Sequence, residues 1–261
     1  MRKLNKGITV CGSGPTVVLL HSSLSSAKQW QRLVNLLKAR FTLINMDLLG
    51  YGDAGQVMDK ENYCFDIEVQ RILAVVQDVI PEQKFHLVGH SCGGAIALKM
   101  ATEVPEMVLS LSLFEPVAFH LFIDESKERQ QVVAFAEQIH QIESSLAAQA
   151  FVDYWNGQGY FAQLPEKVQQ QMALSINKVV LDFKGIFAER YNLERLEQIK
   201  FPCLFLYGKY SPELSQLLSQ KIISHLPNVE QHQVLSGHMA PLSHPQLVEP
   251  LIVEFLMSFK G

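Results

Sequence analysis

A serine set between two glycines is the feature of this sequence best suited to covalent chemistry. The motif Gly-x-Ser-x-Gly spans Gly89, Ser91 and Gly93, follows an apolar run that ends at His90, and opens a segment of helical period. This strand, turn and helix context makes so short a motif meaningful. Small residues two positions to either side let strand and helix approach, so the backbone can adopt the strained angles of a sharp turn. The pattern predicts that Ser91 Oγ stands clear at a helix N-terminus, where amide groups favour developing negative charge.

The elements that must position Ser91 alternate between short apolar runs and longer segments of helical period. That alternation is typical of a parallel sheet covered on both faces by crossover helices. We predict strands at Thr16 to Ser22, Thr42 to Asp47, Phe85 to His90, Val108 to Phe114, Pro202 to Tyr207 and Val229 to Leu235. We predict helices at about Ala27 to Ala39, Ile67 to Val79, Cys92 to Val104, Pro212 to His225 and Gln246 to Phe259.

The alternation breaks once, between about Phe119 and Leu196, where helical segments follow one another without a convincing strand. We therefore predict a core formed by residues 1–117 and 197–261, with a helical cap inserted at 118–196. The insertion holds a large share of the aromatic residues. Two interpretations stay open: its inner face lines a substrate pocket, or its aromatic residues form only a subdomain core.

Four blocks of the sequence resemble the α/β-hydrolase superfamily, and together they span nearly the whole chain. They are Leu19 to Ser23, Asp47 to Gly52, the motif around Ser91, and Ser236 to His238. The resemblance implies an α/β fold with a mostly parallel, doubly wound sheet of about eight strands and a helical cap. The Asp47 block matches a loop that is structural in the superfamily more often than catalytic.

A serine hydroxyl is a weak nucleophile, so catalysis requires a histidine within hydrogen-bond reach to take its proton. Of the nine histidines, His238 follows the last predicted strand, where the resemblance implies the base. His244 is its nearest rival, whereas His90 is expected to point away from Ser91. We predict that Ser91 is the nucleophile and His238 the general base.

The acid of the expected triad does not stand at its usual place. Superfamily members most often carry an aspartate just after the penultimate strand, where this chain has Ser211. One group of haloalkane dehalogenases instead uses a glutamate at the end of the strand that follows the nucleophile's helix, and Glu115 matches that position. A carboxylate at the carboxyl end of a parallel strand points into the crevice where α/β active sites form. We predict Glu115 as the acid, with Glu213 next, then Asp124, and a purely structural Glu115 as the alternative.

Acyl transfer also needs two amide donors for the oxygen that becomes charged. By the resemblance these are the backbone amides of Cys92 and of Ser23, although Ser22 stands where the family carries glycine. The Cys92 thiol itself is expected to pack rather than react, because the turn directs residue 91 into the pocket.

Composition limits the kind of protein that this chain forms. With 48% hydrophobic and 18% charged residues among 261, it buries a core and is too apolar to be disordered. A formal net charge of -4 and the lack of a Lys or Arg run argue against a nucleic-acid partner. The apolar runs are shorter than the roughly 18 residues that span a bilayer. A small-molecule substrate is the expected partner, and the oligomeric state stays open.

Cysteine and histidine spacing argues against a metal or redox site. The four cysteines lie far apart at Cys11, Cys64, Cys92 and Cys203, without a zinc-type or redox-type pair. We expect free thiols in a reducing compartment, which favours a cytoplasmic location. Without a phosphate-binding glycine loop or a metal-type histidine spacing, no metal or other cofactor is expected.

These features predict a serine hydrolase that acts on a small, largely apolar carboxylic ester or related acyl compound through an acyl-enzyme. Two alternatives remain open: a cofactor-free dioxygenase, lyase or acyltransferase on the same fold, or a non-catalytic ligand-binding protein. Dehalogenation is disfavoured because the dehalogenases that the chain resembles carry aspartate at the position of Ser91. The presence of both Ser91 and His238 argues against a binding protein.

Overall fold

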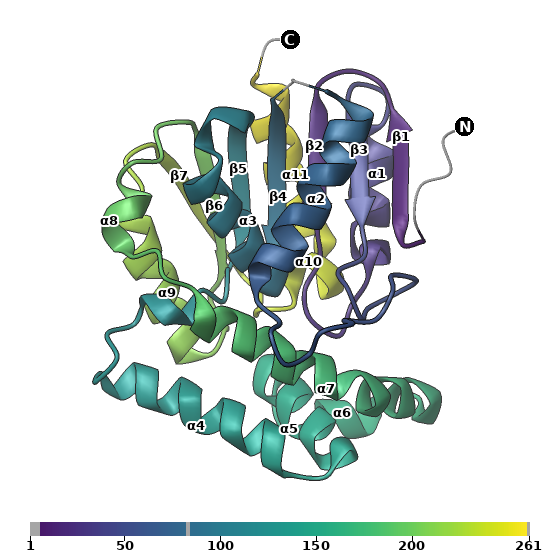
Figure 1. The fold of residues 1–261 in the computed structure, drawn as a ribbon, viewed down its shortest axis with the longest axis vertical. Coiled ribbons are helices and arrows are strands. Elements are labelled where there is room, and N and C mark those ends of the chain that lie inside the picture. Colours follow the sequence, from purple (N-terminus) through teal and green to yellow (C-terminus); the bar gives the residue numbers. More distant parts are fainter. Residues whose placement is uncertain (1–5, 82–83, 260–261) are drawn as a thin grey trace.

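The computed structural model describes residues 6–81 and 84–259, and a seven-stranded sheet forms its centre (Figure 1). The strands lie in the order β1-β3-β2-β4-β5-β6-β7. β1 pairs antiparallel with β3, and every other pair is parallel. The strands are β1 (Ile8–Gly12), β2 (Thr16–Leu20), β3 (Thr42–Met46), β4 (Phe85–His90), β5 (Val108–Phe114), β6 (Cys203–Gly208) and β7 (Val229–Val234).

The predicted α/β class and mostly parallel sheet are confirmed, with seven strands in the described residues where about eight were expected. The strand that the sequence did not reveal is β1, which lies at the edge of the sheet. Its five residues are half-buried or exposed, so they form no apolar run. An edge strand packed on one side lacks the continuous hydrophobic signal of a strand buried on both faces.

The two faces of the sheet carry separate hydrophobic cores. Along β2, Val17 and Leu19 pack into one core and Val18 and Leu20 into the other, and all four are fully buried. Because successive side chains of a strand point to opposite faces, a strand covered on both sides must be apolar throughout. This explains why the runs in the sequence are continuous rather than alternating.

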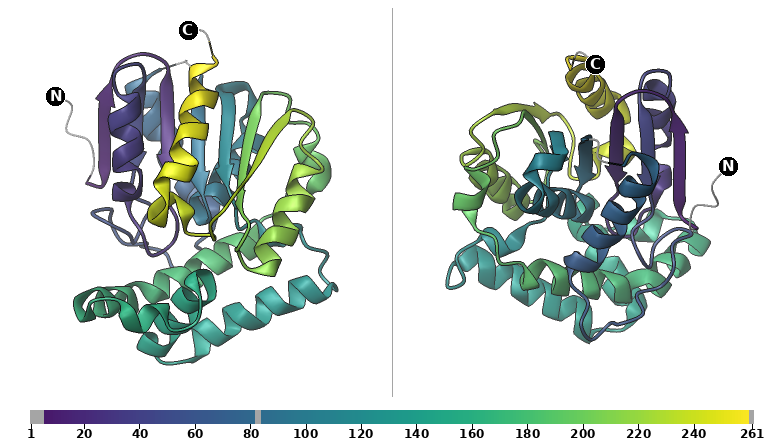
Figure 2. Two further views of the ribbon diagram at one scale, coloured as in Figure 1. Left: turned by 180° about the vertical axis from the view of Figure 1, so that it is seen from behind. Right: turned by 45° about the horizontal axis from the view of Figure 1, so that its top comes forward.

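Helices cover both faces of the sheet (Figures 1 and 2). The view from behind in Figure 2 shows α1 and α11 across one face, and Figure 1 shows α2 and α3 across the other. The predicted first helix divides into a 3-10 turn, η1 (Ala27–Trp30), and α1. Besides η1, the helices and turns around the sheet are α1 (Gln31–Leu37), α2 (Phe65–Val79), α3 (Cys92–Glu103), η2 (Pro105–Met107), α9 (Glu213–Ile223), α10 (Ala240–Ser243) and α11 (Pro245–Met257).

A helical layer formed by residues 119–188 lies across the end of the sheet where the parallel strands terminate (Figure 1). It consists of η3 (Phe119–Leu121), α4 (Lys127–Gln141), α5 (Ser144–Asn156), α6 (Tyr160–Gln163) and α7 (Glu166–Ala188), and the chain then returns along the side of the sheet through α8 (Leu193–Leu196). The carboxyl ends of parallel strands are where α/β proteins form their active sites. The helical layer therefore closes the crevice into which the candidate residues point.

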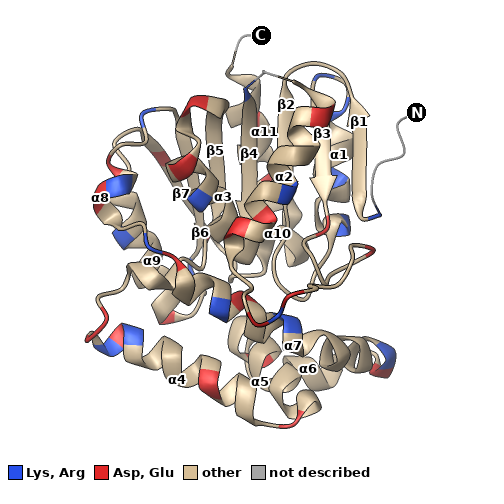
Figure 3. Ribbon diagram, in the orientation of Figure 1, with Lys and Arg blue, Asp and Glu red and all other residues tan. Residues whose placement is uncertain are grey.

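Charged residues of both signs are interspersed over the core and the helical layer (Figure 3). Across residues 6–81 and 84–259, none of the helices is both long and apolar enough to cross a bilayer.

Candidate active site

The turn between β4 and α3 holds Ser91 in a conformation that few non-glycine residues adopt. Its φ is 55° and its ψ is -117°. A Cβ atom at Gly93 would lie 2.4 Å from the carbonyl oxygen of His21, and one at Gly89 would lie 2.6 Å from that of Gly93. Neither separation is compatible with a side chain, so glycine is required where the turn, the helix and the loop after β2 meet. The local sequence thus explains why a strained serine projects from this edge of the sheet.

His238 and Glu115 meet at the same edge through a short, fully buried contact. His238 Nδ1 lies 2.7 Å from Glu115 Oε2, and the two side chains are 1% and 0% exposed. A carboxylate oxygen can only accept, so Nδ1 donates. Nε2 is then the ring nitrogen that takes no part in this contact, and His238 and Ser91 line one cavity. The pair has the arrangement of acid and base in a serine triad.

Three donors hold the Glu115 carboxylate. The Gly208 amide donates to Oε1 at 2.7 Å, and the Ser215 hydroxyl donates to Oε2 at 3.0 Å beside His238. Glu115 itself has a φ of 40°, which turns its side chain out of the end of β5. A buried charge is tolerated only when it is paired and hydrogen-bonded, and this carboxylate is both.

The other candidate acids do not reach His238. Ser211 stands at the usual position of the acid and is buried, but its Oγ has no hydrogen-bond partner among the residues that the structure describes. Glu213 is exposed at the start of α9. Asp124 is 83% exposed and pairs with Arg129 at 3.5 Å. Of the carboxylates considered from the sequence, the structure brings only Glu115 to the histidine.

His244 and His90 both lie near His238 but have different partners. His244 is exposed, and its Nδ1 lies 3.0 Å from Ser236 Oγ. His90 is fully buried, and its Nε2 donates to the backbone carbonyl of His238 at 2.9 Å. Burial and the neighbouring His238 hold the pKa of His90 well below its ordinary value. A neutral His90 therefore supports the loop that carries His238, a role that the sequence did not reveal.

The loop after β2 is joined to the serine turn by the amide of Gly93, which donates to the His21 carbonyl at 3.1 Å. Ser22, where the family carries glycine, is accommodated by Gln29: its amide and hydroxyl both donate to Gln29 Oε1, at 3.2 and 3.0 Å. Ser23 lines the same cavity as Ser91. These contacts bring the loop of Ser23 beside the turn of Ser91, and the oxyanion role of the Ser23 and Cys92 amides stays a prediction.

The side chain of Cys92 is fully buried beneath the turn. Burial raises the pKa of its thiol well above the ordinary value, and the charge of Asp182 adds to the effect. A thiol with a raised pKa is a poor nucleophile. This environment matches the expectation that Cys92 packs rather than reacts.

A buried polar cluster, which the sequence did not reveal, joins the helical layer to the loop of Ser23. Asp182 Oδ2 accepts hydrogen bonds from Ser23 Oγ and from the Tyr51 hydroxyl, each at 2.6 Å. Lys178 Nζ donates to Asp182 Oδ1 and, at 3.0 Å, to the Tyr63 hydroxyl. All of these side chains are buried. The cluster fixes α7 against the loop that would supply an oxyanion donor.

Electrostatics keep this cluster in one protonation state. Burial by itself would lower the pKa of Lys178, but the Asp182 carboxylate raises it above the ordinary value. Burial and Asp182 raise the pKa of Tyr51 well above its ordinary value, so the phenol remains a donor. Lys178 and Asp182 stand one helical turn apart among apolar residues. This spacing could have revealed the cluster from the sequence, because opposite charges one helical turn apart on a buried helix face are expected to pair.

Trp155 of α5 covers the site on the side of the helical layer and stacks on His238. The two ring centroids are 3.9 Å apart and the rings are inclined by 28°. Ser91, His238 and Trp155 line a cavity of about 200 Å³. Its other wall residues are Ser22, Ser23, Leu24, Ser25, Phe151, Val152, Asn156, Tyr160, Leu164, Met172, Met239, Leu242 and Ser243. Aromatic residues of this segment therefore line the cavity at Trp155, Phe151 and Tyr160, and Trp155 and Phe151 also belong to the hydrophobic core.

Metal-ligating side chains do not gather at this site. Within the described parts of the chain, no group of three or more His, Cys, Asp or Glu side chains has the arrangement of a metal site.

The sequence matches the family model described as alpha/beta hydrolase fold over residues 15–245. The chain therefore belongs to this family, as the four sequence blocks predicted. It is 33% identical over 125 residues to fluoroacetate dehalogenase from Burkholderia sp, a match that covers 44% of this chain and 39% of that relative.

Two further relatives match over almost their whole length. A 2-succinyl-6-hydroxy-2,4-cyclohexadiene-1-carboxylate synthase, provisionally so named, from Bacillus subtilis (strain 168) is 26% identical, with 95% of this chain and 94% of the relative covered. Pimeloyl-[acyl-carrier protein] methyl ester esterase from Legionella pneumophila (strain Corby) is 24% identical, with 94% and 96% covered. The three names cover different reactions, so the family alone does not assign this chain's reaction.

Proposed function

We propose that this protein is a serine hydrolase that cleaves small carboxylic esters through Ser91, His238 and Glu115. The observation that carries the proposal is the buried 2.7 Å contact between His238 Nδ1 and Glu115 Oε2, on the same cavity as a strained Ser91. A histidine oriented by a carboxylate, on the same cavity as a serine, is the arrangement that activates a hydroxyl nucleophile.

The reaction proceeds in two halves. In the first, Ser91 Oγ bonds to the ester carbonyl carbon while His238 Nε2 takes the hydroxyl proton, and the amides of Ser23 and Cys92 hold the oxyanion. The bond to the alcohol oxygen then breaks, and His238 returns its proton to that oxygen. In the second, His238 takes a proton from water, the resulting hydroxide attacks the acyl-enzyme, and the acid leaves as Ser91 regains its proton.

Hydrolysis of esters is favoured over dehalogenation and over simple binding. Displacement of a halide would need a carboxylate where this chain carries Ser91. A binding protein would gain nothing from a carboxylate buried with a histidine, since such a pair carries a desolvation cost. Strained backbone angles at both Ser91 and Glu115 add to the argument, because such strain gathers at functional sites. The esterase named among the relatives is compatible with this reaction.

A fluorophosphonate probe tests the proposal directly. The wild type and Ser91→Ala are incubated with the probe, their intact masses are recorded, and release of p-nitrophenol from its acetate is followed in parallel. We expect labelling at Ser91 together with ester turnover, and loss of both in the alanine variant. A well-folded wild type that neither reacts with the probe nor releases p-nitrophenol would overturn the proposal.

A further inference from the structure

Two cavities meet at Ser91, and only one of them includes the histidine. The larger, of about 200 Å³, is lined by Ser91 and His238. The smaller, of about 10 Å³, is lined by Ser91, by the hydrogen-bonded pair Ser23 and Asp182, and otherwise by apolar side chains such as Val117 and Phe183, but His238 is absent from its lining. A volume of this size holds about one water molecule.

The chemistry of ester cleavage assigns the two parts of a substrate to these cavities. The leaving alcohol must lie beside His238, because that residue returns the proton to the alcohol oxygen. The alcohol therefore occupies the larger cavity. The acyl group is directed to the small cavity, where space for one water-sized group fits the hydrogen or methyl substituent of a formyl or acetyl carbonyl and not a long chain.

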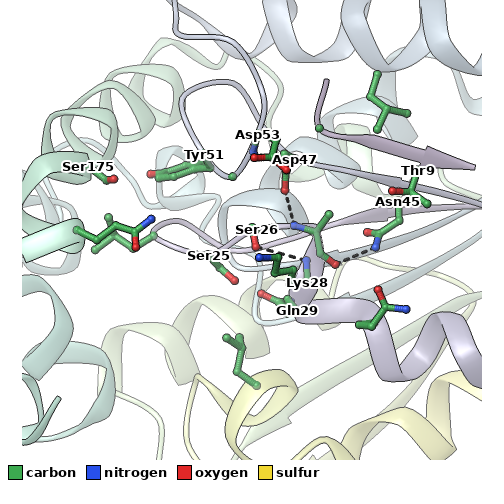
Figure 4. A pocket seen from close by; sticks show the side chains of 18 of the residues that line it. Thr9, Ser25, Ser26, Lys28, Gln29, Asn45, Asp47, Tyr51, Asp53 and Ser175 are labelled. Carbon is green, nitrogen blue, oxygen red and sulfur yellow. Dashed lines mark hydrogen bonds between the residues drawn. The ribbon is translucent and has the colours of Figure 1, made fainter. Parts of the chain in front are cut away.

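The larger cavity adjoins a wide groove of about 850 Å³ between the sheet edge and α7. The two spaces share the wall residues Leu24, Ser25, Met172 and Leu242. Figure 4 shows this groove, with Ser175 of α7 on one side and Thr9 of β1 on the other. The groove is therefore the neighbouring space for an alcohol that extends beyond these four residues.

Hydroxyl, amide and carboxylate side chains line the groove, among them those of Thr9, Gln29, Asn45, Gln171 and Ser175. Lys28 and Asp53 are exposed charges of opposite sign. The carboxylate of Asp47 already accepts from the amides of Ala27 and Asp53, at 2.6 and 2.8 Å. The groove is thus suited to an uncharged ligand with many hydrogen-bonding groups.

Hydrogen bonds drawn in Figure 4 hold the floor of the groove in place. Asp47 Oδ1 accepts from the Ala27 amide, and Asn45 Nδ2 donates to the Ala27 carbonyl at 2.8 Å. Both backbone groups of Ala27 are therefore fixed by buried side chains of β3 and its following loop. A preformed surface binds a ligand without the cost of ordering it first.

Leu24, on the wall that the cavity and the groove share, has a strained backbone conformation. In the described residues, the non-glycine residues with positive φ are Ser91, Glu115 and Leu24, whose φ is 53°. The first two are the proposed nucleophile and acid. Leu24 directly follows Ser23 and lies on the wall common to cavity and groove. An outlier of this kind persists only where surrounding structure enforces it, which points to a functional position.

We propose that the substrate is a short-chain acyl ester of an uncharged polar alcohol, whose alcohol part passes Leu24 and binds in this groove. The inference rests on the proposed ester hydrolysis and adds the substrate class. Hydroxyl, ether or amide groups along the alcohol pair with the side chains of the groove, while the acyl group remains in the small cavity.

Matched acetate esters test this inference. We compare kcat/KM for triethylene glycol monoacetate with that for heptyl acetate, whose alcohol is extended but apolar. The wild type is expected to favour the glycol ester by about tenfold, the equivalent of one or two hydrogen bonds. In the double variant Gln171→Leu and Ser175→Leu, this preference should fall by roughly threefold or more, because two polar groups of the groove are lost.

Two controls separate the groove from the catalytic step. Leu174→Ala changes a residue of the same helix that is 83% exposed and absent from the groove lining, and it should leave the preference unchanged. Leu174→Ala should also turn over p-nitrophenyl acetate at the wild-type rate. Equal rates for the two acetates, with p-nitrophenyl acetate still cleaved through Ser91, would overturn only the groove assignment. If none of these esters is cleaved, the proposed function fails and the inference fails with it.

Discussion

The carboxyl edge of the sheet and the helical layer both reach the cavity at Ser91, but they are built by different means. Ser91 and Glu115 stand at the ends of adjacent strands, on backbone angles that their turns enforce. The helical layer contributes Trp155 and Asp182 from regular helices, through side-chain contacts alone. The comparison suggests that the sheet edge supplies the chemistry and that the layer positions and encloses it.

The largest effect is expected at the sheet edge, in Glu115→Gln. This variant keeps the shape of the side chain but removes the charge that stabilises a protonated His238, so kcat should fall by about 10³-fold to 10⁴-fold. Steady-state ester hydrolysis measures the loss, and circular dichroism checks the fold. The control Glu213→Gln alters an exposed carboxylate and should hydrolyse esters at the wild-type rate. Wild-type kcat in Glu115→Gln would reject the assigned acid.

A smaller effect is expected where the layer meets the sheet edge, in Asp182→Asn. Lys178 is left as a buried charge without its partner, so the free energy of unfolding should fall by roughly 3 kcal/mol. The loop of Ser23 also loses its contact to α7, and kcat should fall by about tenfold to a hundredfold as the oxyanion donor is displaced. Urea unfolding and ester hydrolysis measure the two effects.

A double variant distinguishes positioning from stability at this cluster. Lys178→Met with Asp182→Leu removes both charges, so much of the lost stability should return, because apolar residues often replace a buried ion pair without loss. The reduced kcat should persist, since Ser23 still has no acceptor on α7. If kcat recovers together with stability, the cluster has only a structural role.

Trp155 tests whether the layer acts on the base through stacking. Trp155→Leu removes the ring above His238, and kcat/KM should fall by about tenfold, whereas Trp155→Phe should lose less because it keeps an aromatic face. The pair of variants is compared on p-nitrophenyl acetate. Equal losses in the two variants would show that the volume of the side chain matters and the aromatic ring does not.

The smallest effect concerns buried histidines of the core. Burial lowers the pKa of His86 to about 4. The unfolded chain therefore binds more protons between about pH 6.5 and 4, and stability is complete above this window and is lost as the pH falls through it. The expected loss is up to about 1 kcal/mol per pH unit. Urea unfolding of the wild type and His86→Gln should show a shallower pH dependence in the variant; identical slopes would contradict it.

The candidate residues at the sheet edge were predictable from sequence because each lies beside a local sequence pattern that fixes its place at the end of a strand or in a loop. The glycines around Ser91, the end of an apolar run at Glu115 and the loop before the last helix each mark one position along the chain. The match to a dehalogenase-type acid position then selected Glu115 over Glu213.

The helical layer was not predictable to the same degree, because its contacts join distant segments. Ser23 and Asp182 are hydrogen-bonded across 159 positions of sequence. Nothing in the local pattern of α5 distinguishes Trp155 from the other aromatic residues of that helix. Strand β1 was not predicted for a related reason: an edge strand with exposed residues carries little hydrophobic signal.

Capture of the covalent intermediate tests the central claim most directly. The enzyme is mixed with excess p-nitrophenyl acetate, quenched in acid within the first turnover, and analysed by intact mass and peptide mapping. We expect one added acetyl group per chain, located on Ser91, and none in Ser91→Ala. An acetyl group on another residue, or p-nitrophenol release that continues unchanged in Ser91→Ala, would contradict it.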